Sequence, residues 1–166
     1  WKEAVKMPWG ILLLYGGGMS LAKAFETSGL ALWIGKQFSV LGAFHLLILL
    51  LLLVAAINFL TEVTSNLATT AMLLPVLAPI ALEFDLHPFV LMAAAAVAAS
   101  CAFMLPVATP PNAVVFGSGY LRIPDMVRKG FFLNLISIII IAMMVYFLLP
   151  LIWNLIPEKF PSELLN

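Results

Sequence analysis

Charged residues are scarce in this sequence. Only 10% of its 166 residues are Asp, Glu, Lys or Arg, whereas 64% are hydrophobic. Soluble domains carry about 25% charged residues, and a soluble fold of this size would leave much of its surface facing water. No Asp, Glu, Lys or Arg occurs in the stretches 37–61, 63–82, 86–121 and 130–157. Because roughly 20 apolar residues cross a bilayer as a helix, the composition predicts an integral membrane protein surrounded by lipid.

Cysteine and basic clusters are equally rare. Cys101 is the single cysteine, which excludes a disulfide within the chain. The formal net charge is +0 and no basic run occurs, so nucleic acid is not expected as a partner. The apolar runs are continuous and rich in Leu, Ile and Ala, without the alternation typical of barrel strands. We therefore expect an all-α integral membrane fold, since helices satisfy their own backbone hydrogen bonds in lipid.

Polar and proline-containing breaks divide the apolar runs into segments. The opening "WKEAVKMPW" lacks an initiator methionine and a signal-peptide pattern, so we expect a missing N-terminal part. In order, the sequence predicts a scaffold-type transmembrane helix plus a short interfacial helix (1–41), a re-entrant helical hairpin with its tip at 64–67 (42–82), a helix broken at 105–112 (88–121), a final transmembrane helix (130–153) and a tail (154–166).

The distribution of Lys and Arg predicts the orientation in a plasma (inner) membrane. The loop 121–129 holds Arg122, Arg128 and Lys129 against a single acid, so we expect it to be cytoplasmic. The turn 83–87 holds acids and no Lys or Arg, so we expect it to face outward, together with the C-terminal tail. With 88–121 crossing once, the hairpin would enter and leave the membrane on the outer side.

The breaks "TSN" and "ATPPN" share a chemical pattern. Ser65 and Asn66 precede one apolar helix, and Thr109 to Asn112 precede another. Ser, Thr and Asn are favoured N-caps, and proline suits the first helical turn. Each break would aim a helix N-terminus, with free N–H groups, toward the membrane interior, where it can hold an anion. Carbonyls and hydroxyls at the preceding helix ends can hold Na⁺, as in secondary transporters with broken helices. Kinks in ordinary transmembrane helices are the alternative interpretation.

The stretches "FLTEVTSNLATTAMLLPVLAPIA" (59–81) and "ASCAFMLPVATPPNAVVFGSGYLRIPDMVRKGFFLNL" (99–135) resemble a known family. They are similar to the C-terminal half of the divalent-anion/sodium symporters, the sodium–dicarboxylate and sodium–citrate transporters. The resemblance implies one inverted repeat of a secondary transporter, incomplete here, with a hairpin and a broken helix. It also implies a homodimer of full-length chains and a missing N-terminal half that completes the site.

In that family each hairpin tip carries a Ser-Asn-Thr motif that binds substrate carboxylates. By the resemblance, the substrate-binding residues are Ser65, Asn66, Leu67, Thr109 and Pro110. The implied sodium-binding residues are Thr61, Thr64, Asn66, Ala108 and Pro110, partly through main-chain oxygens. The third motif position is Leu67 rather than threonine, which removes a hydroxyl next to the substrate and is expected to narrow or change the anion accepted.

Supporting roles are expected for Glu62, Pro111 and Asn112. Glu62 is the one carboxylate within 37–82, and an acid at membrane depth is a functional candidate. We favour support of the hairpin tip over direct cation binding for it, and we expect Asn112 to cap or brace the broken helix. Asn58 is predicted to pair with Glu62, at i, i+4 spacing, or with a neighbouring helix, and Asn134 to bond between helices.

The function expected from these features is sodium-coupled transport of a small di- or tricarboxylate anion of the succinate, malate, fumarate or citrate class, by alternating access. Na⁺ would be the coupling ion, and no cofactor is expected. A sodium-independent anion exchanger of the same family and a structural membrane subunit are the alternatives. An intramembrane enzyme is not expected, because Asp85 and Asp125 lie in loops and neither histidine lies near Ser65.

Overall fold

The computed structural model describes residues 45–161 continuously, together with positions 1, 13, 16, 17, 20, 23, 24, 27–30 and 33. In this described part the chain is helical and holds no strand, which confirms the all-α prediction there. The predicted helices within 1–41 and the end of the tail, 162–166, lie outside the described residues apart from those single positions.

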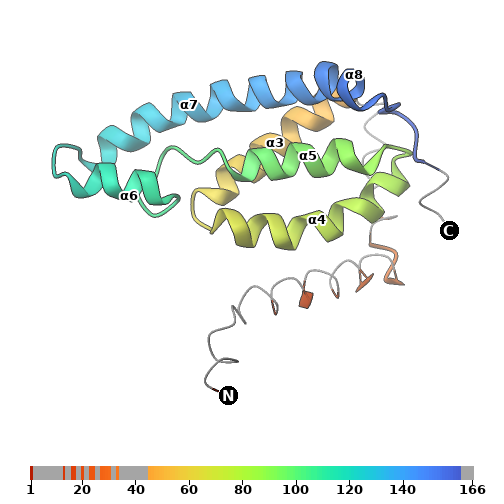
Figure 1. The fold of residues 1–166 in the computed structure, drawn as a ribbon, viewed down its shortest axis with the longest axis horizontal. Coiled ribbons are helices and arrows are strands. Elements are labelled where there is room, and N and C mark those ends of the chain that lie inside the picture. The colour runs from red at the N-terminus through yellow and green to blue at the C-terminus, as the bar shows by residue number, and fades with distance from the viewer. Residues whose placement is uncertain are drawn as a thin grey trace.

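The described chain is a succession of helices joined by non-helical connecting segments (Figure 1). Their order is α3 (Leu46–Thr61), α4 (Asn66–Glu83), α5 (Pro88–Ala99), α6 (Pro110–Gly117), α7 (Ile123–Met143), a π-helical turn η2 (Met144–Leu148) and α8 (Leu149–Trp153). Two continuous helical stretches, Asn66–Glu83 and Ile123–Trp153, are long and apolar enough to cross a membrane, with mean hydropathies of 1.4 and 2.8.

Helices α3 and α4 are joined by a tight turn and run antiparallel, and both pack on α5 (Figure 1). Ser65 begins α4 as its N-cap, with the extended backbone that N-caps adopt (φ −74°, ψ 133°). Pro75 and Pro79 lie inside α4, yet the helix continues to Glu83.

The break after α5 begins earlier than predicted. The sequence placed it at 105–112, whereas α5 ends at Ala99 and the next helix begins only after the N-cap Thr109. The reason is a tertiary contact, because the backbone N–H groups of residues 103–105 donate to the Glu62 side chain instead of continuing the helix. We call residues 100–109 the link.

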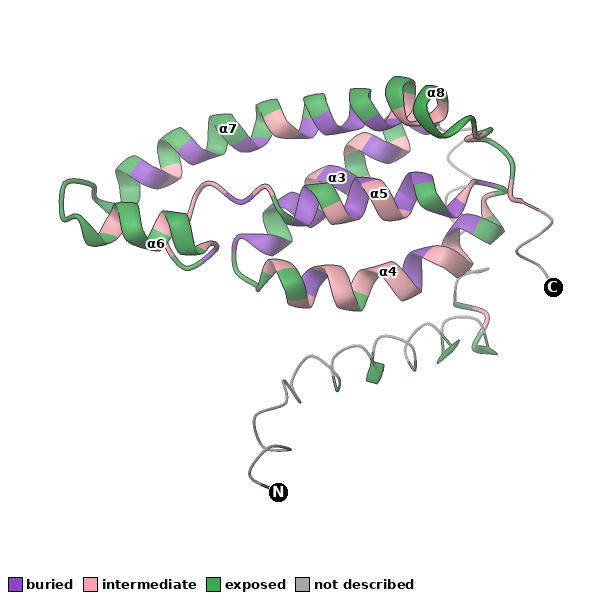
Figure 2. Cartoon of the chain, viewed as in Figure 1, coloured by how far each residue is buried: buried purple, intermediate pink, exposed green. Residues whose placement is uncertain are grey.

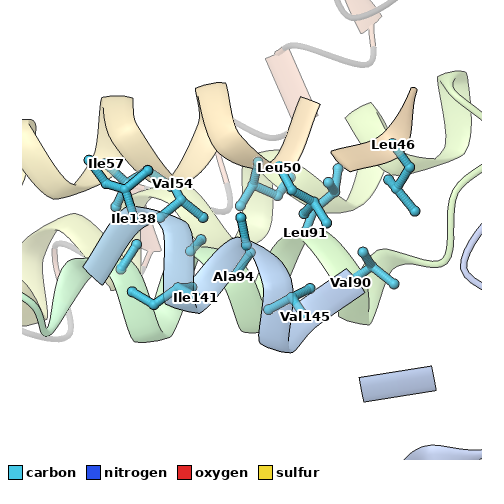
Figure 3. Close-up of a cluster of buried hydrophobic side chains, with 14 of the residues drawn as sticks. Leu46, Leu50, Val54, Ile57, Val90, Leu91, Ala94, Ile138, Ile141 and Val145 are labelled. Carbon is cyan, nitrogen blue, oxygen red and sulfur yellow. The ribbon is translucent and has the colours of Figure 1, made fainter. Parts of the chain in front are cut away.

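The core lies where α3, α5 and α7 meet (Figure 3). Leu50 and Val54 of α3 face Val90 and Ala94 of α5, and Ile138 of α7 closes the cluster. The small side chains of the alanine-rich α5 allow its neighbours to approach closely. By contrast, the outward side of α7 is exposed and apolar over most of its length (Figure 2), as expected for a surface in contact with lipid or another membrane segment.

The segment after α8 returns to the turn between α4 and α5. The His87 N–H donates to Pro157 O at 2.9 Å, and the Phe160 N–H donates to Asp85 Oδ1 at 3.0 Å. Burial lowers the pKa of His87, which favours the neutral ring whose Nδ1 accepts the Phe89 N–H at 3.3 Å and caps α5. This histidine therefore serves the helix start.

Candidate functional site

The turn between α3 and α4 presents two exposed side chains at the start of a long helix. Ser65 makes no capping hydrogen bond with its hydroxyl, although its carbonyl accepts the Thr69 N–H at 2.8 Å. Leu67, the second residue of α4, is 55% exposed. Because the hydroxyl is not used within the helix, the first turn of α4 retains a side-chain donor and partly unpaired backbone N–H groups for an anion.

Behind these exposed residues lies a buried group of oxygen atoms. The Thr61 hydroxyl oxygen is 2.7 Å from Asn66 Oδ1 and 2.9 Å from Ala99 O, and Thr61 is completely buried. One hydroxyl proton cannot serve both acceptors at full strength, so the group is richer in oxygen than in donors. We call Thr61, Asn66 and Ala99 the oxygen cluster, and oxygen ligands of this type suit a hard cation.

The other predicted sodium residues have different partners. Thr64 donates its hydroxyl to Leu60 O at 2.9 Å and lies 2.6 Å from the Thr69 hydroxyl. Ala108 is buried in the link, and Pro110 begins α6. Among the described residues, no hydrogen bond joins Ala108 or Pro110 to the hairpin turn. The structure thus brings Thr61 and Asn66 together directly, and it adds Ala99 O, which the sequence did not suggest.

Glu62 binds the link through its carboxylate. Oε1 accepts the N–H groups of Phe103 at 2.7 Å and Met104 at 2.9 Å, and Oε2 accepts those of Met104 at 3.1 Å and Leu105 at 3.0 Å. The side chain of Asn134 in α7 donates to Oε1 at 2.8 Å. Every contact comes from an N–H donor, so both carboxylate oxygens act as hydrogen-bond acceptors. Glu62 is only 3% exposed, and it holds the link rather than a ligand.

Helix α7 approaches the link without a side chain between them. A Cβ atom added at Gly130 would lie 2.5 Å from the carbonyl carbon of Phe103 and 2.6 Å from the Cα of Met104, and would also overlap Phe103 O. Gly130 and Asn134 are one helical turn apart, so they share a face of α7. The glycine allows the backbone to approach, and the asparagine reaches the carboxylate that binds the same stretch of the link.

The start of α6 is organised by Thr109 and Asn112. The Thr109 hydroxyl accepts the Asn112 N–H at 3.4 Å as an N-cap, and Pro110 and Pro111 occupy the first turn. The Asn112 side chain donates to Ala102 O at 3.0 Å and Leu105 O at 3.1 Å. Asn112 therefore braces the link across the break, through contacts of the kind expected for it.

Two asparagines differ from the simplest expectation. Asn58 does not bond to Glu62; its amide donates to Cys101 O at 2.6 Å and to Ser137 Oγ at 3.2 Å, which is the neighbouring-helix alternative. Asn134 does join two helices, but through the Glu62 carboxylate. Sequence reasoning missed Gly130 altogether. The available signal was the pair Gly130 and Asn134 at i, i+4 spacing in an otherwise apolar helix.

Comparison with known proteins places this arrangement in a family. Residues 1–154 match the family described as "Sodium:sulfate symporter transmembrane region". The chain is 49% identical over 150 residues to the "Sodium-dependent dicarboxylate transporter SdcS" of Staphylococcus saprophyticus, with 90% of this chain and 29% of that protein covered. It is also 49% identical over 152 residues to the protein of the same name from Staphylococcus aureus strain MRSA252, with coverages of 92% and 29%.

The chain therefore spans 29% of the length of these curated relatives. The match covers nearly all of this chain, including the hairpin turn, the link and α7. It agrees with the apolar composition and with the two helical stretches of membrane-spanning length. The resemblance read from the motifs is confirmed: this chain is an integral membrane protein of the sodium:sulfate symporter family.

Proposed function

We propose that the chain forms the C-terminal part of a sodium-coupled transporter of di- or tricarboxylates that works by alternating access. The observation that carries the proposal is the junction of an exposed helix start at Ser65 with the buried oxygen cluster directly behind it. An anion site and a cation site that share Asn66 would couple the binding of the two ions. Two relatives are named as sodium-dependent dicarboxylate transporters, which supports this pairing and points away from an enzyme.

In this proposal the anion binds between the starts of α4 and α6. Its protein ligands on this chain are Ser65, Asn66, Leu67, Thr109 and Pro110. Both helix N-termini carry partial positive charge and free N–H groups, which attract a carboxylate. Sodium is held by Thr61, Thr64, Asn66, Ala108 and Pro110, where hydroxyl, amide and main-chain oxygens are available. Glu62, Pro111 and Asn112 support these sites through the link and the first turn of α6.

Helices α3 and α4 act as a re-entrant hairpin in this proposal. The 16 residues of α3 correspond to roughly 24 Å, less than the ~30 Å hydrocarbon core, whereas the 18 residues of α4 reach the length of a short span. With the arms entering from the outer side, the turn at 64–67 would lie inside the membrane, residues 121–129 would be cytoplasmic and the C-terminal tail outside. Most of 121–129 is not the predicted loop, because α7 begins at Ile123 rather than at 130. A homodimer, lipid on the apolar faces and the remaining part of the transporter complete the assembly that we propose.

The decisive experiment is uptake of labelled succinate and citrate by the complete transporter in proteoliposomes. We expect uptake to require an inward Na⁺ gradient and to fall to background when choline replaces Na⁺. Flux of equal size without Na⁺, driven by an anion inside the vesicles, would instead establish the sodium-independent exchanger.

Replacing Ser65 or Asn66 with alanine is expected to lower uptake at limiting substrate at least tenfold. Ser65→Ala removes a hydrogen-bond donor to the anion. Asn66→Ala removes a donor to the anion and an oxygen from the cation site. Each lost hydrogen bond to a charged group corresponds to about 1.5–3 kcal/mol. Ser118→Ala is the matched control, because that hydroxyl bonds only to neighbouring backbone at the end of α6, donating to Val115 O and accepting the Tyr120 N–H. Normal transport by both site variants would support the structural-subunit alternative.

Replacing Leu67 with threonine is expected to lower the KM for the smallest dicarboxylate about tenfold, without changing the Na⁺ dependence. Leu67 is exposed, so the change adds a hydroxyl next to the anion at little cost to folding. KM is measured for succinate and citrate side by side. Leu67→Ala separates the two effects, because it removes bulk without adding a hydroxyl. An equal fall in KM for both variants would show that side-chain bulk alone determines the KM.

A further inference from the structure

We propose that α7 sets the sodium affinity of the hairpin site, with Asn134 and Gly130 as positioning residues that act through the Glu62 carboxylate. The inference rests on the proposed function, because it concerns the same cation site. It adds a second helix, which touches neither ion, to the residues that determine how tightly the cation is held.

The first step is the charge of Glu62. Its contacts are backbone N–H groups of the link and the Asn134 amide, so within residues 45–161 no cationic side chain neutralises it. Glu62 directly follows Thr61, whose hydroxyl belongs to the oxygen cluster. It also caps the C-terminus of α3, where the helix dipole is negative. A buried negative charge one residue from the cluster raises the affinity for a cation there without coordinating it, because the surrounding medium screens weakly.

The second step is the orientation of the Asn134 side chain. Its Nδ2 donates to Glu62 Oε1, while its Oδ1 is fully buried and has no hydrogen-bond partner. Rotating the amide would place its oxygen against the carboxylate, so the charged acceptor decides the orientation. A side chain kept only to join two helices would be expected to satisfy both of its polar ends. The unpaired oxygen therefore indicates that donation to Glu62 is the contact this asparagine provides.

The third step is the position of α7. Gly130 brings the helix backbone against Phe103 and Met104, whose N–H groups bind Glu62. The carboxylate is therefore fixed from one side by the link and from the other by Asn134. Moving α7 would shift Oε1 of Glu62. Because Thr61 directly precedes Glu62, the Thr61 hydroxyl would shift with it. Substitutions of residues that orient metal ligands typically weaken metal affinity about 10-fold to 100-fold.

The test compares Asn134→Ala with wild type in the complete transporter, reconstituted in proteoliposomes. The Na⁺ concentration for half-maximal succinate uptake is expected to rise about tenfold. The succinate KM at saturating Na⁺ is expected to change less than twofold, because the anion ligands are untouched. Ser137→Ala is the matched control: it removes a hydroxyl one turn along α7 that bonds to Asn134 O and accepts from Asn58 but does not contact Glu62. Its half-saturating Na⁺ concentration should equal that of wild type.

A second variant, N134L, distinguishes positioning from packing. Asn134 is completely buried, and leucine fills its space without offering a donor to the Glu62 carboxylate. If Asn134 acts by donating to Glu62, the half-saturating Na⁺ concentration of N134L should rise as it does in Asn134→Ala. A wild-type value in N134L would show that packing alone is needed at this position.

Two outcomes would overturn the proposal: an unchanged half-saturating Na⁺ concentration in Asn134→Ala, or a loss of protein in the membrane with normal Na⁺ dependence of what remains. If Asn134→Ala does not assemble, N134L is decisive: a wild-type half-saturating Na⁺ concentration in N134L counts against the proposal. Failure of the proposed function is recognised separately, because the wild-type transporter itself would then show no Na⁺ dependence.

Discussion

Replacing Glu62 with alanine is expected to destabilise the transporter by at least about 3 kcal/mol and to abolish uptake. The change leaves the N–H groups of the link at Phe103, Met104 and Leu105, and the amide of Asn134, without their acceptor in a buried position. Each buried polar group that loses its partner costs about 1–3 kcal/mol. Thermal unfolding of the purified transporter and Na⁺-dependent uptake are the measurements.

Glu62→Gln is expected to be milder but still strongly impaired. Its amide oxygen can accept the N–H groups that Oε1 accepts, but its NH₂ group would then face the Met104 and Leu105 N–H donors that Oε2 accepts. Glu83→Gln is the matched control, because it removes an acid from the exposed end of α4. Wild-type stability and uptake in Glu62→Ala would contradict the assignment of the carboxylate as the group that holds the link.

Replacing Gly130 with alanine is expected to reduce uptake at least tenfold and to lower the melting temperature. The added Cβ would meet the backbone of Phe103 and Met104, which cannot rotate away as a side chain would. Overpacking of this kind typically costs 1–3 kcal/mol, and here it also separates α7 from the link and from Glu62. The melting temperature is read from the purified transporter, and uptake from proteoliposomes.

Gly117→Ala is the control for this substitution. Gly117 ends α6, and a Cβ added there would meet nothing within 4 Å. Alanine is also the better helix former, so this variant should match or slightly exceed wild-type stability. Equal behaviour of Gly130→Ala and Gly117→Ala would contradict the close approach of α7 to the link.

Local chemistry made several elements predictable. Runs without charge predicted helices, and Ser65 and Thr109 were recognised as helix starts because N-capping depends on residues within one turn. The bracing role of Asn112 followed from the same local pattern. The family likeness rested on the hairpin and broken-helix motifs, and it extends over residues 1–154. Which of the implied site residues bind anion or cation stays a prediction.

Contacts between distant segments were not predictable in the same way. The end of α5 at Ala99 depends on Glu62, which is 41 residues from its partner Phe103. Asn134 lies 72 residues from the carboxylate that it binds. Helix propensity and hydrophobic pattern describe near neighbours in sequence, so neither could place these groups together.

The sequence by itself determined the helical membrane class, the helix starts at Ser65 and Thr109 and the family, because each depends on composition or on residues within a turn of one another. Only the tertiary structure decided how Glu62 is used. A buried carboxylate needs donors, and the chain supplies them from the link and from α7, with Gly130 allowing the approach. That requirement joins the hairpin, the link and α7 into one structural unit.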